Sequence, residues 1–327
     1  MTKSVIIQFL DVLLFLTIRP TVNPANFVSI FSPLNNIIRK LYKKDMKILC
    51  CCLRAKFLTG SEVYFYELCS ALTLLSHSVT LAATEVSDHF IKYCSGYNFK
   101  IINLDNLNEK DFDLIILSHA QETYKKIQFL MPNTKIINIC HSEIYESELP
   151  LISDQVIKYV GIRQPICDKM YSCGIDREKI ELIRNPINLN RFNTQNITDE
   201  KFGLFVGTMG GLRYKSALHF ASFCKANNLQ SIYISAENQE LPFFDLNLRM
   251  VENVEQYFKK CSISGGIIHG RTYFEARLCG KPTIEYFINN MGAITNIDYE
   301  DAPDDKELKY LQNQFDKTEV AKRIIAV

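Results

Sequence analysis

The feature that most constrains this sequence is a series of continuous apolar runs of strand length, each followed by a helical or loop segment. The first, MKILCCCLR at 46–54, leads through a Gly-containing loop into an amphipathic segment over 62–75. Strands that are apolar at every position are buried on both faces, which is typical of a mostly parallel sheet covered by helices. The pattern therefore predicts an α/β protein. Similar runs lie at 78–84, 99–104, 113–119, 135–141, 156–162, 202–208, 231–237 and 281–287.

A polar, Asn-rich stretch at 188–199 divides these runs into two series. A chain of 327 residues suits two domains, at roughly 100–200 residues each. We therefore expect a helical or hydrophobic extension over 1–45, a first Rossmann-like domain over 46–190 and a second over 191–327. A cleft between two such domains is the default place for a ligand.

Charge and cysteine usage narrow the class of protein. Lys and Arg number 37 against 36 Asp and Glu, a net charge of +1, whereas a nucleic-acid binder is expected to carry a basic surplus. The 11 cysteines are odd in number and none falls in a CxxC spacing. We interpret Cys50, Cys51 and Cys52 as small apolar strand residues in a reducing compartment, which predicts a cytoplasmic protein.

The first 45 residues differ from the rest. The apolar stretch over 5–18 is interrupted by Gln8 and Asp11 and is shorter than the roughly 20 residues that a membrane span needs. A second stretch over 27–41 has apolar residues at helical spacing and is followed by basic residues. Such a helix can lie on the cytoplasmic face of an anionic membrane. We favour a helix packed on the domain or a disordered leader, with peripheral membrane contact as the alternative.

Three glycine-containing turns carry the chemistry, each between a strand and a helix. The turn at 58–62 has Gly60 ahead of a helix N-terminus, which attracts anions. The turn at 206–217 adds Arg213 and Lys215, cations that suit a diphosphate. The turn at 266–272 precedes a helix that carries Glu275, a carboxylate able to accept ribose hydroxyl groups. The sequence also lacks GxGxxG at the first turn, which argues against a nicotinamide dinucleotide.

Taken together, these segments resemble the GT-B glycosyltransferases of family 4, which are retaining enzymes that use nucleotide sugars. The similarity covers about residues 46–290 and rests on four motifs in the same order. They are the opening strand, loop and helix at 46–72, the run YVGI to NRF at 159–192, the phosphate loop VGTMGGLRYK at 206–215, and GRTYFEARLCGKPTI at 270–284. The resemblance implies two Rossmann-like, doubly wound domains that face a central cleft.

The resemblance also implies a donor site. Arg213 and Lys215, in the phosphate loop with Gly207, would bind the diphosphate of the donor. Glu275 matches the second glutamate of the family's E-x7-E signature and would hold the nucleotide ribose. The turn residues Gly270, Arg271 and Thr272 would line the pyrophosphate and the sugar, and Gly60 would close the site from the first domain.

Two histidines are candidates on the acceptor side. His141 lies where family members often place a polar residue facing the transferred sugar, so we name it with Glu275 as catalytic. The alternative for His141 is a capping or core imidazole. His119, which ends the preceding strand run, is a weaker second candidate.

The sequence departs from the family pattern at two positions. Ile267 stands where the first glutamate of E-x7-E is expected, and Thr208 stands where many members have an arginine. The first departure removes a carboxylate from the donor-sugar site. The only Asp-x-Asp pair near a strand, Asp111 and Asp113, lies in the acceptor domain, so we expect no cofactor and no essential metal.

These observations predict a metal-independent, retaining hexosyltransferase that uses a UDP-sugar or GDP-sugar in glycan biosynthesis. The acceptor is a hydroxyl group on a glycan, a lipid-linked sugar or a protein. One alternative is a catalytically inactive GT-B relative that binds a nucleotide sugar or a partner protein. Another is a nucleotide-sugar epimerase of the same two-domain fold.

Overall fold

The computed structural model describes residues 45–326, apart from 144–145, 209, 211–212, 236–238 and 290. The expected N-terminal extension and its membrane contact lie outside the described residues. Residues 46–327 form one compact unit, which contains two open sheets. The proposed domain limits at 190 and 191 stay a prediction.

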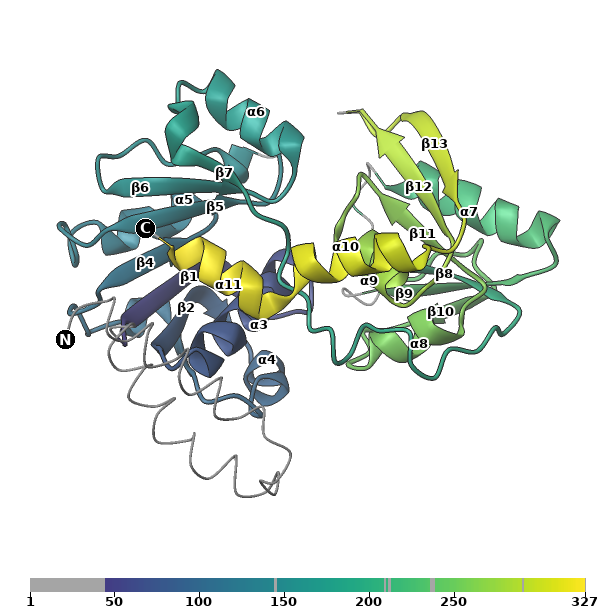
Figure 1. Ribbon diagram of the computed structural model, residues 1–327, viewed down its shortest axis with the longest axis horizontal. Coiled ribbons are helices and arrows are strands. Elements are labelled where there is room, and N and C mark those ends of the chain that lie inside the picture. Colours follow the sequence, from purple (N-terminus) through teal and green to yellow (C-terminus); the bar gives the residue numbers. More distant parts are fainter. Residues whose placement is uncertain are drawn as a thin grey trace, which may run out of the picture. The chain divides into compact units, whose positions relative to one another are not determined.

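The first sheet is wholly parallel and follows the order β3-β2-β1-β4-β5-β6-β7 (Figure 1). This order reverses direction between β1 and β4, as in doubly wound nucleotide-binding folds. The apolar runs of the central strands are buried here, including Cys50, Cys51 and Cys52 in β1, as the sequence predicted, whereas the edge strand β3 is exposed or half-buried. The strands are β1 (Lys47–Ala55), β2 (Ser78–Val86), β3 (Lys100–Asn103), β4 (Leu114–Leu117), β5 (Ile136–Cys140), β6 (Val156–Gly161) and β7 (Ile180–Leu182).

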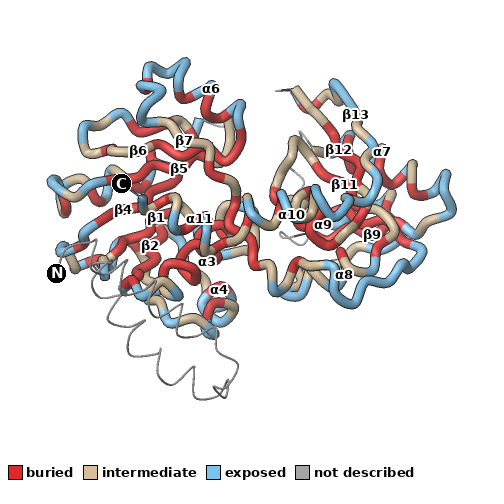
Figure 2. The backbone as a smooth tube through the Cα atoms, in the orientation of Figure 1, coloured by how far each residue is buried: buried red, intermediate tan, exposed pale blue. Residues whose placement is uncertain are grey.

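Helices cover this sheet, and the first of them is the most deeply buried. Helix α3 begins at Gly60 after the N-cap Thr59 and ends at Leu74. Its buried side chains include Tyr64, Phe65 and Leu68, which join the core around β1. Figure 2 shows the strands and α3 as the buried centre of this half of the chain. The other helices are α4 (Asp88–Tyr93), α5 (Ala120–Ile127) and α6 (Gln164–Ser172).

The second sheet repeats the same strand order on a smaller scale. It runs β10-β9-β8-β11-β12-β13 and is parallel except for β13, which pairs antiparallel with β12. The sequence analysis missed β10 and β13, because both are short or polar and carry no continuous apolar run. The elements are β8 (Phe202–Gly207), α7 (Tyr214–Ala226), β9 (Gln230–Ser235), β10 (Leu246–Leu248), α8 (Val254–Lys260), β11 (Ile263–Ile267), α9 (Arg271–Leu278), β12 (Thr283–Ile288) and β13 (Ile294–Glu300).

Two C-terminal helices connect the two halves. Helix α10 (Asp305–Phe315) packs on α9, and α11 (Lys317–Ile325) packs on α3 of the first half (Figure 1). Lys317 is buried at the start of α11, where its Nζ lies 3.1 Å from Oε2 of Glu67 and 3.0 Å from Oγ of Ser70. The last helix of the chain therefore packs on the first domain, a return that the sequence analysis did not foresee.

Within the described part of the chain, the helices are all too short or too polar to cross a membrane.

Candidate functional site

One pocket of about 200 Å³ is lined by residues of all three glycine-containing turns that the sequence analysis singled out. It lies where β8 and β11 end, at the point where the strand order of the second sheet reverses. Ligands of doubly wound sheets bind at this kind of switch point. The predicted site residues that line it are Gly60, Gly207, Arg213, Gly270, Arg271, Thr272 and Glu275.

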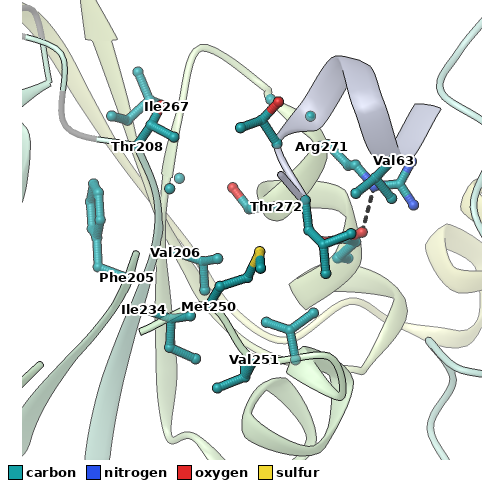
Figure 3. A pocket seen from close by; sticks show the side chains of 18 of the residues that line it. Val63, Phe205, Val206, Thr208, Ile234, Met250, Val251, Ile267, Arg271 and Thr272 are labelled. Atoms are coloured by element: carbon teal, nitrogen blue, oxygen red, sulfur yellow. Dashed lines mark hydrogen bonds and ion pairs between the residues drawn. The ribbon is translucent and has the colours of Figure 1, made fainter. Parts of the chain in front are cut away.

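One wall of the pocket is apolar. Val206 belongs to β8 and Ile234 to β9, while Met250 and Val251 come from the loop before α8. Figure 3 shows these side chains with Phe205 on one side of the pocket and Arg271 and Val63 on the other. A flat, weakly polar ring such as a nucleobase can stack against a wall of this kind, with its polar edge left to the main chain.

Opposite this wall, helix α9 begins at the pocket. Gly270 is its N-cap, and Thr272 and Glu275 follow within the first turn and a half. The unpaired N–H groups of a helix N-terminus give it a partial positive charge, which favours a phosphate. Oε2 of Glu275 accepts no hydrogen bond from any described residue, so it remains available to a hydroxyl group of a ligand.

Glu275 is tied to Arg271 one helical turn earlier. Nε of Arg271 lies 2.6 Å from Oε1 of Glu275, and both side chains are more than nine-tenths buried. Burial raises the pKa of Glu275, and the charge of Arg271 opposes that rise. Nη1 of Arg271 also donates to the carbonyl of Pro186 at 2.8 Å. Arg271 thus binds the segment between the two sheets as well as lining the pocket.

The Gly60 loop is organised by a residue that the sequence analysis did not single out. Glu62 is buried, and its two carboxylate oxygens accept hydrogen bonds from the main-chain N–H groups of Lys56, Phe57 and Thr59 at 2.9–3.1 Å. The Thr59 hydroxyl also donates to it, at 2.6 Å. The carboxylate therefore satisfies amide donors of the loop ahead of α3 and fixes the loop that borders the pocket.

The two predicted phosphate cations lie in different environments. Arg213 lines the pocket, and its Nη1 donates to the carbonyl and hydroxyl of Thr208 at 3.3 Å each. Lys215 is exposed on the first turn of α7 and is not part of the pocket lining. Ile267 does line it, so an apolar side chain occupies the place where the family resemblance places a carboxylate.

Arg191 is a second residue that the sequence analysis left without a role. It lines the pocket and forms an ion pair with Glu255 at 2.6 Å. Its Nη1 donates to the hydroxyl of Tyr93 at 2.7 Å, and Tyr93 lines the pocket from α4 of the first half. The only signal in the sequence was the position of Arg191 in the NRF motif, because its partners are about 60 and 100 residues away.

His141 is not among the residues that line the pocket. Its ring packs edge-on against Tyr64 at 4.7 Å between ring centres, and its Nε2 is shielded from solvent with no partner within the described residues. Burial lowers the pKa of His141 to about 4, so the imidazole is neutral at neutral pH. A direct catalytic contact for His141 stays a prediction.

His119 is linked to His141 through a buried glutamate. Nε2 of His119 lies 3.1 Å from Oε1 of Glu148, while Oε2 of Glu148 accepts the main-chain N–H of His141 at 3.0 Å. Burial alone would raise the pKa of Glu148, but the hydrogen bond from His119 and the nearby imidazoles lower it. Glu148 thus joins the side chain of His119 to the main chain of His141, next to the carboxyl ends of β4 and β5.

The described residues contain no group of three His, Cys, Asp or Glu side chains that could hold a metal ion. The predicted metal independence remains untested.

Comparisons with known proteins show the fold. No protein-family model matches the chain, and no curated protein matches it either. Among solved structures, HepE (Alr3699) of Anabaena in complex with UDP-glucose superimposes with a TM-score of 0.65 at 13% identity, covering 85% of this chain and 98% of that one. AviGT4, a glycosyltransferase of avilamycin A biosynthesis, gives 0.60 at 14% identity, with 86% and 96% covered.

A third structure, a putative UDP-N-acetylglucosamine 2-epimerase from Listeria monocytogenes, gives a TM-score of 0.52 at 9% identity over 86% of this chain and 95% of that one. These likenesses and the two strand orders establish the two-domain Rossmann-like GT-B fold that the sequence predicted.

Proposed function

We propose that this protein is a glycosyltransferase that transfers a hexose from a nucleoside-diphosphate sugar to a hydroxyl acceptor. The observation that carries the proposal is the pocket itself. An apolar wall for a base, a buried glutamate with one available oxygen, and a helix N-terminus with Arg213 meet within one cavity at the switch point of the second sheet.

UDP is the nucleotide that we favour. HepE was crystallised with UDP-glucose and with UDP, and an α-glucosyltransferase of TM-score 0.50 was crystallised with UDP. The apolar wall of Val206, Ile234 and Val251 offers no side-chain donor or acceptor to read the larger edge of a guanine. A GDP-sugar is the second choice.

The chemistry follows from the charges around the pocket. The leaving group is a nucleoside diphosphate, whose negative charge grows as the glycosidic bond breaks. Arg213 and the N-terminus of α9 are fixed in place before the reaction, so they stabilise that charge without reorganisation. Glu275 would accept ribose hydroxyl groups through Oε2. We propose that these groups replace a metal ion and that the reaction retains the anomeric configuration.

The acceptor, a glycan, a lipid-linked sugar or a protein, and the cytoplasmic location belong to the same proposal. The residues near the first-sheet side of the pocket, Leu58, Thr59 and Val63, are mostly apolar. They would exclude water from the reacting sugar and limit hydrolysis of the donor.

Two observations favour other functions. Ile267 in place of a carboxylate favours an inactive relative that binds a nucleotide sugar without turnover. The likeness to the putative Listeria epimerase favours an epimerase. Product analysis separates these two alternatives. An epimerase would change the sugar of the donor without any acceptor, whereas an inactive relative would form no product.

A thermal-shift panel of UDP, GDP, ADP and CMP-linked sugars, followed by product analysis, tests the proposal. We expect stabilisation by UDP-sugars and transfer or slow hydrolysis of the matching donor. Binding without turnover would support the inactive relative, and no shift with any donor would contradict the site assignment.

A further inference from the structure

The turn between β11 and α9 has an unusual backbone. Ile268 and His269 follow each other with φ angles of 53° and 46°, in the left-handed region that residues with side chains rarely adopt. The turn joins two residues of the pocket, Ile267 and Gly270. Such a conformation persists only when the surroundings fix it. The direction in which α9 points at the pocket therefore depends on what holds this turn.

Two side chains from different parts of the chain hold it. Oε1 of Glu285, on β12, accepts a hydrogen bond from the main-chain N–H of His269. Nη1 of Arg163 donates to the carbonyl of Ile268 at 3.1 Å. Arg163 precedes α6 in the first half of the chain, and its Nη2 is fixed by Glu143 at 2.7 Å. The turn is thus anchored from the other half of the chain and from its own sheet, where the main-chain N–H of Ile268 also donates to the carbonyl of Tyr286 at 3.0 Å.

Glu285 is placed for this one contact. It is fully buried and lies opposite Gly266 in the β11–β12 pairing. A Cβ atom at Gly266 would collide with Oε2 of Glu285, so the glycine leaves the room that the carboxyl group occupies. Oε2 has no hydrogen-bond partner within the described residues. A buried carboxyl group that makes a single hydrogen bond is costly, and neither core packing nor a salt bridge accounts for it here.

We propose that Glu285 is a positioning residue of the donor site, whose carboxyl group holds the left-handed turn and so sets the N-terminus of α9 against the ligand phosphates. The inference rests on the proposed function, because it assigns Glu285 a role in donor binding. Glu285 does not line the pocket and makes no direct contact with a ligand there. Arg163 supports the same turn from the first half of the chain.

The neutral form of Glu285 is the one that fits this environment. Burial raises its pKa to about 8, the N–H of His269 opposes that rise, and the charge of Arg163 opposes it less strongly. Ionisation would leave a charged oxygen without a partner and would attract Arg163 away from the carbonyl of Ile268. The titratable and charged groups that face Glu285 are His269, Tyr273, Asp298, Glu300 and Arg163.

The test measures the dissociation constant of UDP by calorimetry with the full chain, from pH 6.5 to 9.5. Glu285→Gln keeps the shape and the acceptor oxygen but cannot ionise. We expect wild-type affinity to fall about tenfold more than that of Glu285→Gln as the pH passes 8, with the two equal near pH 7. Glu285→Ala should bind about tenfold or more weakly at every pH. Any ionisation of UDP itself affects all variants equally and therefore cancels in the ratio of their dissociation constants.

Asp245→Asn is the matched control. Asp245 accepts hydrogen bonds from Ser231 in the same sheet, away from the pocket, and should change stability without changing the pH profile of binding. Identical pH profiles for wild type and Glu285→Gln, or unchanged affinity in Glu285→Ala, would overturn the inference. If Glu285→Ala fails to fold, the pH profiles of the wild type and Glu285→Gln still test the inference. Absence of UDP binding by the wild type would instead contradict the proposed function.

Discussion

Arg271 and Glu275 form a buried ion pair at the start of α9, with Nε and Oε1 2.6 Å apart. The same arginine donates to the carbonyl of Pro186, in the segment that joins the two sheets. The carboxylate that we assign to the ribose is therefore fixed to the connection between the halves of the chain. A change at either residue is expected to affect both donor binding and stability.

Variants at Glu275 and Arg271 should separate the effect on donor binding from the effect on stability. Glu275→Ala leaves Arg271 buried without its partner, which we expect to lower the free energy of unfolding by about 3–5 kcal/mol. UDP-sugar affinity should fall by roughly 100-fold, since the ribose acceptor is lost. Denaturant titration measures the free energy of unfolding, and calorimetry measures the affinity for the UDP-sugar. In the double variant Arg271→Met with Glu275→Leu, stability should recover while binding stays weak; recovery of binding would contradict the ribose assignment.

Arg213 should contribute more to phosphate binding than Lys215. Arg213 lines the pocket, whereas Lys215 is exposed and lies outside its lining. We expect Arg213→Ala to weaken UDP binding by about tenfold or more, because a charge-assisted hydrogen bond is lost. Uridine, which has no phosphate, should bind the variant and the wild type alike. A larger effect of Lys215→Ala than of Arg213→Ala would contradict this order.

The buried pair of Lys317 and Glu67 should matter for stability alone. Nζ of Lys317 and Oε2 of Glu67 are 3.1 Å apart between α11 and α3, and neither residue lines the pocket. Lys317→Met should cost about 3–5 kcal/mol of unfolding free energy, because it leaves a buried carboxylate. Adding Glu67→Gln should recover part of the loss. UDP affinity of the folded variants is expected to equal that of the wild type.

His141 should make the protein less stable in mild acid. Its pKa is lowered to about 4 in the folded chain, against about 6.5 when unfolded, so the unfolded state binds the proton first as the pH falls. Stability from this group is fully present above about pH 6.5 and is lost down to about pH 4, roughly 3 kcal/mol in all. His141→Phe should flatten that slope. Titration of the ring by NMR near pH 6.5 would contradict the buried placement.

The sequence predicted the local parts of the fold well and the long-range parts poorly. Continuous apolar runs identified β1 and the strands that flank it, because burial on both faces leaves a composition that can be recognised. The antiparallel β13 was missed, because its sequence ITNIDYE contains no continuous apolar run. The return of α11 to α3 was missed because the partners Lys317 and Glu67 are separated by 250 residues, and nothing local marks them.

In the candidate site, too, the local features could be predicted from the sequence and the long-range contacts could not. Glycine turns between strand and helix led to Gly60 and Gly270, and both residues line the pocket. Glu62 and Glu285 were not singled out, although each fixes one of these turns. Glu285 lies in a strand where a glutamate reads as an edge or surface residue, and its partner His269 is 16 positions away. Only the folded register brings them together.

The most direct test of the central claim is the release of UDP from UDP-sugars by the purified full chain, followed by NMR together with the anomeric signal of the sugar product. UDP-glucose, UDP-galactose and UDP-N-acetylglucosamine are the donors to compare, with GDP-mannose alongside. We predict that one UDP-sugar is turned over with retention and that Glu275→Ala abolishes the turnover. Release that is unchanged in Glu275→Ala, or no binding and no turnover of any donor, would contradict the assignment of this pocket as a glycosyl donor site.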